Sequence, residues 1–212
     1  MSRIIIFGAG GRAGRATVGA ARDRGHEVTA VVRDPARHPD LAADGGVRVT
    51  AGDVTDADRV AGLMAGHDAA VHAAADLAAP PDVFFPAAAR ATLAGSRRAG
   101  VGRLVVVGLA SVLPTADGVP LMDTPGYPQE YRGFYLGHAA GAEVLRRTGG
   151  DVDWLVLSPA GDFDHGGTPA GRYRFAPARA ESRITYADLA LALLDEIERP
   201  GHRRVHLGVE RG

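Results

Sequence analysis

The strongest chemical signal in the sequence is a glycine-rich segment close to the N-terminus. Residues 8–14 read Gly-Ala-Gly-Gly-Arg-Ala-Gly, which fits the spacing G-x-x-G-x-x-G and also G-x-G-x-x-A. Glycines at this spacing permit a tight turn and a close approach of the backbone to a pyrophosphate, and the following helix offers free amide groups. We therefore expect a dinucleotide-binding loop made by Gly8, Gly10, Gly11, Arg12, Ala13 and Gly14. The alternative interpretation is a plain flexible turn.

An arginine stands where the second strand is expected to end, in the sequence Val31-Val32-Arg33. A site for NAD(H) usually places an acidic residue here for the ribose hydroxyls, whereas a guanidinium suits the 2′-phosphate of NADP(H). Arg33, with Arg12 as a second contact, therefore favours NADP(H) over NAD(H). The neighbouring Asp34 keeps some use of NAD(H) open, and a solvated charge is the other interpretation of Arg33.

Two further segments are placed to contact the rest of such a cofactor. Asp53 and Val54 follow the expected third strand, where the carboxylate can bind the adenine amino group and the valine can pack on the ring. A turn that begins the next helix explains Asp53 almost as well. Ala74 and Ala75 follow the fourth strand and are small enough to let a ribose lie close.

Apolar runs and helical segments alternate along the chain, as in successive β-α-β units. Strands are expected at 3–7, 26–32, 47–51, 68–74, 103–108, 154–157, 172–175 and 203–209. Helices are expected at 12–24, 56–65 (with Thr55 as N-cap), 83–99, 130–148 and 187–198. Uninterrupted apolar runs such as Leu104–Val107 suit strands that are buried on both faces. We predict an α/β fold: a doubly wound, Rossmann-type parallel sheet with helices on both faces.

No linker or internal repeat divides the chain, so we expect one NAD(P)-binding Rossmann domain over residues 1–212. The second half carries two long loops, at about 112–128 and about 159–177, which are rich in proline or in glycine and proline. Loops after the later strands of such folds commonly carry the substrate contacts. A small substrate region built from these C-terminal loops is therefore expected.

The composition excludes several kinds of chemistry. The chain has no cysteine, lysine or asparagine, and all 24 basic residues are arginine. Thiolate metal sites, cysteine nucleophiles and lysine Schiff bases are therefore excluded. The eight scattered histidines show no ligand spacing, so no metal is expected. A net charge of −1 argues against nucleic-acid binding, and the lack of a long apolar run or signal peptide predicts a cytoplasmic protein that does not bind membranes.

Besides the glycine loop, five segments spread over most of the chain form a recognisable set: Val31–Pro35, Gly52–Val54, Leu104–Gly108, Asp123–Pro128 with Glu130 and Tyr131, and Asp153–Ala160. Together they resemble the NmrA-like, NAD(P)H-binding group of atypical short-chain dehydrogenases. More narrowly, they resemble its NADH–flavin reductase branch, which is related to biliverdin reductase B. The resemblance implies a Rossmann fold, a nicotinamide cofactor and direct transfer of hydride to a flat acceptor.

The sequence departs from ordinary short-chain dehydrogenases at their Tyr-x-x-x-Lys pair. Tyr135 can take the tyrosine position, but Ala139 stands where the lysine belongs. A tyrosine alone, with a reference pKa of about 10, is a weak acid–base group at neutral pH. The resemblance implies that the related flavin reductases also lack this pair. Flavins and quinones suit such sites because their own heteroatoms accept electron density.

Residues 108–111 (Gly-Leu-Ala-Ser) stand where relatives commonly have a more glycine-rich segment. Gly108 is expected beside the cofactor, and Ser111 matches the family serine that orients nicotinamide or acceptor. A turn-capping serine is an equal alternative. His138 lies three residues after Tyr135, on the same expected helix face, and is a candidate to protonate the reduced acceptor. The alternative is that His138 is an ordinary surface residue. Ser111, His138 and Tyr135 are therefore the candidate catalytic residues, although packing explains the tyrosine equally well.

Together these features predict an NADPH-dependent reductase of a flavin, quinone or similar flat small molecule, acting as a monomer or homodimer. One alternative is a pathway-specific reductase that tailors an aromatic polyketide or quinone. The other is a non-catalytic, NADP-binding redox sensor of the NmrA type, which would bind the cofactor without turnover and regulate a partner protein.

Overall fold

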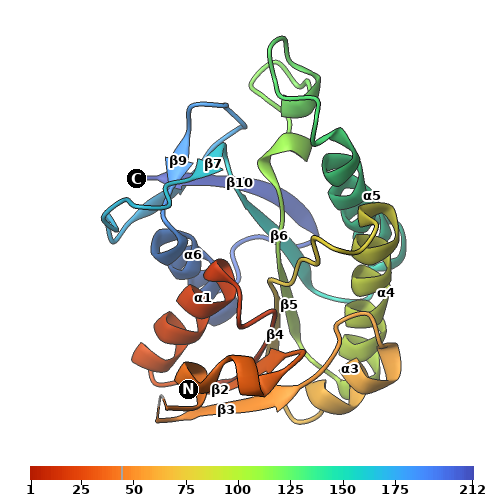
Figure 1. Ribbon diagram of the computed structural model, residues 1–212, viewed down its shortest axis with the longest axis vertical. Helices are drawn as coiled ribbons and strands as arrows, with labels where there is room; N and C mark the ends of the chain where they lie inside the picture. The colour runs from red at the N-terminus through yellow and green to blue at the C-terminus, as the bar shows by residue number, and fades with distance from the viewer. Residues whose placement is uncertain (44) are drawn as a thin grey trace.

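A computed structural model describes residues 1–43 and 45–212, and its centre is an eight-stranded sheet (Figure 1). The strands lie in the order β3-β2-β1-β4-β5-β6-β10-β8. Their bounds are β1 (Arg3–Phe7), β2 (Glu27–Val32), β3 (Val47–Ala51), β4 (Ala69–His72), β5 (Arg103–Val107), β6 (Trp154–Pro159), β8 (Tyr173–Phe175) and β10 (Val205–Arg211). Neighbouring strands are parallel except at the edge, where β10 and β8 are antiparallel.

Helices cover both faces of this sheet. Their bounds are α1 (Arg12–Asp23), α2 (Pro39–Ala43), α3 (Ala57–Met64), α4 (Pro81–Ala99), α5 (Arg132–Thr148) and α6 (Tyr186–Glu198). Helices α1 and α6 pack together on one face, and α3, α4 and α5 lie on the other (Figure 1). A separate two-stranded parallel sheet joins β7 (Asp162–Phe163) to β9 (Arg183–Ile184). The predicted doubly wound sheet, with helices on both faces, is confirmed.

The central strands are apolar throughout because both of their faces are buried. Within β1, Ile5 and Phe7 pack against the layer of α3, α4 and α5, whereas Ile4 and Ile6 pack against α1 and α6. All four side chains are fully buried. Burial of such a side chain stabilises the fold by about 1.5–3 kcal/mol. The core therefore holds the carboxyl end of β1 in place, and with it the loop that follows.

The strand order changes direction at β1, whose neighbours are β2 on one side and β4 on the other. In open α/β sheets, ligands bind in the crevice outside the carboxyl ends of the strands at such a switch point. The glycine-rich residues 8–14 follow β1 directly. The topology therefore places the predicted cofactor loop at the binding edge of the sheet.

The predicted elements differ from the observed ones mainly at their ends, and one predicted cap is wrong. Thr55 does not cap α3; Asp56 does, and its carboxylate accepts a hydrogen bond from the Arg59 amide at 3.0 Å. The short elements α2, β7 and β9 were not predicted, because a few residues carry no readable periodicity. Among the described residues, no helix is long and apolar enough to cross a membrane.

Candidate functional site

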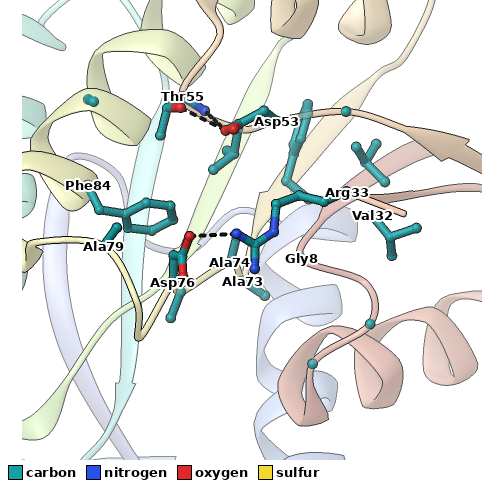
Figure 2. Close-up of a pocket in the computed structure, with 18 of the residues that line it drawn as sticks. Gly8, Val32, Arg33, Asp53, Thr55, Ala73, Ala74, Asp76, Ala79 and Phe84 are labelled. Carbon is teal, nitrogen blue, oxygen red and sulfur yellow. Dashed lines mark hydrogen bonds and ion pairs between the residues drawn. The ribbon is translucent and has the colours of Figure 1, made fainter. Parts of the chain in front are cut away.

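A cleft of about 460 Å³ lies at the carboxyl ends of the strands around β1 (Figure 2). Four stretches of chain contribute most of its wall: the glycine loop and the segments that follow β2, β3 and β4. The residues that line it are Phe7, Gly8, Gly10, Gly11, Val31, Val32, Arg33, His38, Gly52, Asp53, Val54, Thr55, Ala73, Ala74, Ala75, Asp76, Ala79, Val83, Phe84 and Ala87.

At two positions of the glycine loop, a Cβ would overlap backbone atoms of neighbouring segments. Gly8 has a φ of +79°, and a Cβ there would lie 2.5 Å from the Cα of Ala74. A Cβ on Gly14 would lie 2.8 Å from the Cα of Ala9 and would overlap the carbonyl oxygen of Gly8. The amides of Gly8 and Ala9 both donate to the carbonyl of Val31, at 3.1 and 3.2 Å. The loop is therefore fixed between β2, β4 and the start of α1.

The first turn of α1 is left open toward an anion. Gly11 is its N-cap and supplies no side-chain hydrogen bond, and the first turn holds no acidic residue. The amides at a helix start lack partners within the helix, and the dipole there favours negative charge. Gly10 and Gly11 both line the cleft. These residues fit the diphosphate of a dinucleotide, because small residues and amides without a partner in the helix are what close backbone contact with phosphate requires.

His38 and Arg15 contact the glycine loop at Gly10, which the sequence did not reveal. A Cβ on Gly10 would meet the imidazole of His38 at 2.5 Å. The guanidinium of Arg15 donates through Nε to the carbonyl of Gly10 at 2.9 Å and contacts Nδ1 of His38 at 3.0 Å. Arg15 also pairs with Asp40. His38 lies in the irregular segment after β2, where no pattern distinguishes it from other surface histidines.

The structure brings Arg33, but not Arg12, to the cleft. Arg33 follows β2, and its largely exposed guanidinium contacts Asp76 across the cleft at 2.5 Å (Figure 2). The guanidinium of Arg12 instead lies 2.9 Å from Nδ1 of His165, in the loop between β7 and β8. Asp76 was missed as a site residue, since no sequence pattern links it to Arg33.

Of the other cofactor-side predictions, Asp53, Val54, Ala74 and Ala75 lie on the cleft wall, whereas Ala13 and Gly14, both in α1, and Gly108 do not line it. Asp53 also forms the turn that was its alternative interpretation, because its Oδ1 accepts from the amide and the hydroxyl of Thr55 at 2.8 and 2.7 Å (Figure 2). Val54 is buried beneath the cleft. Ala79, Val83, Phe84 and Ala87, from α4 and the loop before it, extend this apolar wall. These four residues were not predicted as site residues, because an amphipathic helix pattern does not show that one end of the helix lines a cleft.

Gly108 and His138 belong to a second cavity of about 30 Å³, between the sheet and helices α4 and α5. His72 from β4 and His206 from β10 share its wall. Burial lowers the pKa of His138 to about 3 and the pKa values of His72 and His206 to about 4, so all three imidazoles are neutral at pH 7. Within the described residues no side-chain group forms a metal site, these histidines included.

The three candidate catalytic residues do not line a common cavity, although the segment that holds Ser111 (Ala110–Val112) packs against α5, the helix of Tyr135 and His138. Ser111 is 0% exposed, and its Oγ has no hydrogen-bond partner among the described residues. Tyr135 is buried with its ring 5.5 Å from that of Tyr127, and burial raises its pKa above the usual value of 10. Neither residue lines the cleft or the second cavity. A Cβ on Gly108 would lie 2.5 Å from Oγ of Ser158, so strand packing alone requires this glycine.

Two curated proteins show how the sequence relates to others. YwnB of Bacillus subtilis (strain 168) is 33% identical over 213 residues, which cover 95% of this chain and 94% of YwnB. The 3-diazoavenalumate denitrifying reductase of a Streptomyces species is 34% identical over 133 residues, which cover 57% of this chain and 42% of that protein.

Solved structures share the whole fold. SP1627 of Streptococcus pneumoniae TIGR4, a candidate NADH-flavin reductase, matches with a TM-score of 0.84 and 27% identity over 100% of both chains. ChuY, an anaerobillin reductase of Escherichia coli O157:H7, has the same fold, with a TM-score of 0.78 and 20% identity over 99% of this chain and 97% of its own. The family model described as NAD(P)H-binding matches residues 8–200. The chain therefore belongs to the NAD(P)H-binding family.

Proposed function

We propose that this protein is an NADPH-dependent reductase that transfers hydride directly to a flavin, a quinone or a similar flat conjugated acceptor. The observation that carries the proposal is the cleft: a glycine-built loop, an open helix start and an apolar wall, with the cation Arg33 at the rim. This combination suits the diphosphate, the adenosine and the 2′-phosphate of NADP(H). NAD(H) is the less favoured cofactor because it lacks the group that Arg33 would bind.

In this proposal each part of the cleft holds one part of the cofactor. Gly8, Gly10 and Gly11, with the amides at the start of α1, bind the diphosphate. Val54 and Phe84 pack on the adenine. Arg33 binds the 2′-phosphate, and Arg12 stays beside His165.

The proposed chemistry needs little from acid–base side chains. When bound, the cofactor would supply a hydride; the conjugated ring system of the acceptor would take the electron pair, and a proton from solvent would complete its reduction. Burial raises the pKa of Tyr135, and Ala139 stands where a lysine would lower it, so Tyr135 cannot exchange protons efficiently at neutral pH. The role proposed for Ser111 is to orient the nicotinamide amide or the acceptor carbonyl through its unpartnered hydroxyl. The chain mainly orients the reactants and excludes water.

The acceptor is proposed to bind on the side formed by residues 112–128 and 159–177. Aromatic rings are present in both segments or packed against them. Tyr127 contacts Tyr135, and Phe163 stacks on Tyr186 with ring centroids 4.0 Å apart. Exposed parts of such rings suit a flat conjugated molecule.

We place the protein in the cytoplasm, as a single domain that acts as a monomer or homodimer.

A pathway-specific reductase is the second candidate function. The observation in its favour is the 34% identity to the 3-diazoavenalumate denitrifying reductase over 133 residues. In this proposal the cofactor cleft is unchanged, and the two loops select one larger aromatic substrate. Free flavins and simple quinones would then be poor acceptors.

The decisive experiment follows the loss of NADPH absorbance on oxidation in the presence of FMN, FAD and a simple quinone, with NADH as the cofactor control. Fast oxidation that prefers NADPH is the expected result. NADPH binding by calorimetry without oxidation of any acceptor would reject the general reductase. It would leave the pathway-specific enzyme or a non-catalytic NADP sensor.

Replacing Arg33 with alanine is expected to lower the preference for NADPH over NADH by about 10- to 150-fold, because a charge-assisted bond to phosphate contributes about 1.5–3 kcal/mol. The measurement is the ratio of the two dissociation constants. Arg37→Ala is the matched control, since Arg37 is an exposed arginine in the same segment that does not line the cleft. An unchanged ratio in Arg33→Ala would contradict the assignment of the 2′-phosphate to Arg33.

A further inference from the structure

The rim of the cofactor cleft carries an ion pair that spans the cleft. Arg33 extends from the end of β2 toward Asp76, in the loop after β4, and Nη1 of Arg33 lies 2.5 Å from Oδ2 of Asp76 (Figure 2). Both residues line the cleft, together with Ala73 and Ala74, which lie at the carboxyl end of β4 between them. The guanidinium that suits a 2′-phosphate is therefore already paired with a carboxylate.

Asp76 is the fixed member of this pair. Its Oδ1 accepts a hydrogen bond from the amide of Ala78 at 3.0 Å, which closes a turn in the loop before α4. Its side chain is 20% exposed, whereas that of Arg33 is 67% exposed. The amide of Ala78 and the guanidinium of Arg33 both lower the pKa of Asp76, so the carboxylate is charged at neutral pH. Arg33 is consequently the partner that can turn toward a ligand while Asp76 stays in place.

No second carboxylate competes for this role in the described residues. Asp34 is adjacent in sequence, but its Oδ1 accepts from the amide of Ala36 and caps the turn Pro35–Arg37. Asp53, also on the cleft wall, is bonded to Thr55. Among the described residues, Asp76 is the carboxylate that forms an ion pair with Arg33.

We propose that Asp76 is a specificity-determining residue that opposes the 2′-phosphate and so reduces the preference of this site for NADPH. The proposal rests on the proposed cofactor site. NADPH has to exchange the Arg33–Asp76 pair for an Arg33–phosphate pair, and it places a phosphate of the same sign near the fixed carboxylate. NADH leaves the pair intact, because its ribose carries a neutral hydroxyl at that position. Like charges brought together at an interface oppose binding, and the effect is specific to the charged ligand.

The test is Asp76→Asn, with dissociation constants for NADPH and NADH measured by calorimetry at neutral pH. Asparagine keeps an Oδ1 that can accept from Ala78, so the turn is preserved while the charge is removed. We expect NADPH to bind about tenfold more tightly and NADH to change by less than about twofold. Asp82→Asn is the matched control: it removes an exposed carboxylate in the first turn of α4 that does not line the cleft, and the ratio should stay as in the unmodified protein.

A second variant separates an effect on the phosphate from a change in the loop. In an Arg33→Ala background, the gain in NADPH affinity from Asp76→Asn should shrink, because only the repulsion by the carboxylate is left to remove. An unchanged or reduced preference for NADPH in Asp76→Asn would overturn the proposal while leaving the cofactor site in place. If the unmodified protein bound neither dinucleotide, the proposed function itself would be rejected, and this inference with it.

Discussion

Replacing Gly14 with alanine is expected to weaken NADPH binding on the order of a hundredfold, because a displacement of about 1 Å in a positioned binding group can cost that much. A Cβ at this position would overlap the carbonyl oxygen of Gly8 and lie 2.8 Å from the Cα of Ala9. Both are backbone atoms, which cannot rotate away as the end of a side chain can. Either the loop or the start of α1 has to move, and the amides proposed to hold the diphosphate move with it.

Gly19→Ala provides a control within the same helix. Gly19 lies in α1, and no heavy atom is found within 4 Å of the position that its Cβ would take. Alanine there should stabilise the helix by about 0.5–1 kcal/mol and leave NADPH binding unchanged. The measurements are the dissociation constant by calorimetry and the melting temperature by circular dichroism. A Gly14→Ala protein that is folded and binds NADPH as tightly as the unmodified protein would show that the loop geometry does not determine binding.

The cofactor loop could be predicted from sequence because its information is local. The glycines, the apolar run before them and the helix after them lie within one short segment, and the turn, the packing and the open helix start all follow from it. Val54 and Ala74 were predictable for a similar reason, since each lies within three residues of the end of a parallel strand, and the carboxyl ends of such strands meet at one edge.

Contacts between distant segments were not predictable in this way. Arg33 was identified, but its partner Asp76 lies in a different loop, and the two meet only because β2 and β4 flank β1 in the sheet. His38 supports Gly10 from an irregular segment. The direction of the His138 side chain could not be predicted from the sequence either. It shares a helix with Tyr135 at a spacing that suggested a common face, yet it faces the second cavity, while Tyr135 packs against Tyr127.

Acidification below pH 6.5 is expected to destabilise the protein steeply. His72, His138 and His206 have pKa values of about 4, 3 and 4 in the folded chain, against an ordinary value of 6.5, because burial disfavours their charged forms. Above pH 6.5 neither the folded nor the unfolded state binds these protons. Between pH 6.5 and about 4 only the unfolded state binds them, so the free energy of unfolding falls as the pH falls. The slope reaches about 1.4 kcal/mol per pH unit for each histidine.

Between pH 6.5 and about 4, the change in the free energy of unfolding comes largely from the histidines. Arginine partners or hydrogen bonds lower the pKa values of Glu143, Asp151, Glu198 and Glu210 from ordinary values of 4.5 or 3.8, so their contribution is present above those values and is lost at lower pH. Burial also lowers the pKa of His67, which acts in the same direction as the three cavity histidines. With a typical total stability of about 5–15 kcal/mol, three such slopes would remove a large part of it by about pH 5.

His138→Leu tests this account without removing a hydrogen bond. The imidazole of His138 packs on the rings of Phe85 and Phe134, with centroids 3.7 and 4.9 Å away, so leucine keeps an apolar contact there. The free energy of unfolding in urea, measured from pH 7.5 down to 4.5, should show a slope reduced by up to about 1.4 kcal/mol per pH unit, with a change of less than about 1.5 kcal/mol at pH 7.5. His165→Leu, at an exposed site, should leave the slope nearly unchanged. Equal slopes for His138→Leu and the unmodified protein would mean that the folded chain accepts the proton on His138, and that the cavity opens to water before the sheet and helices separate.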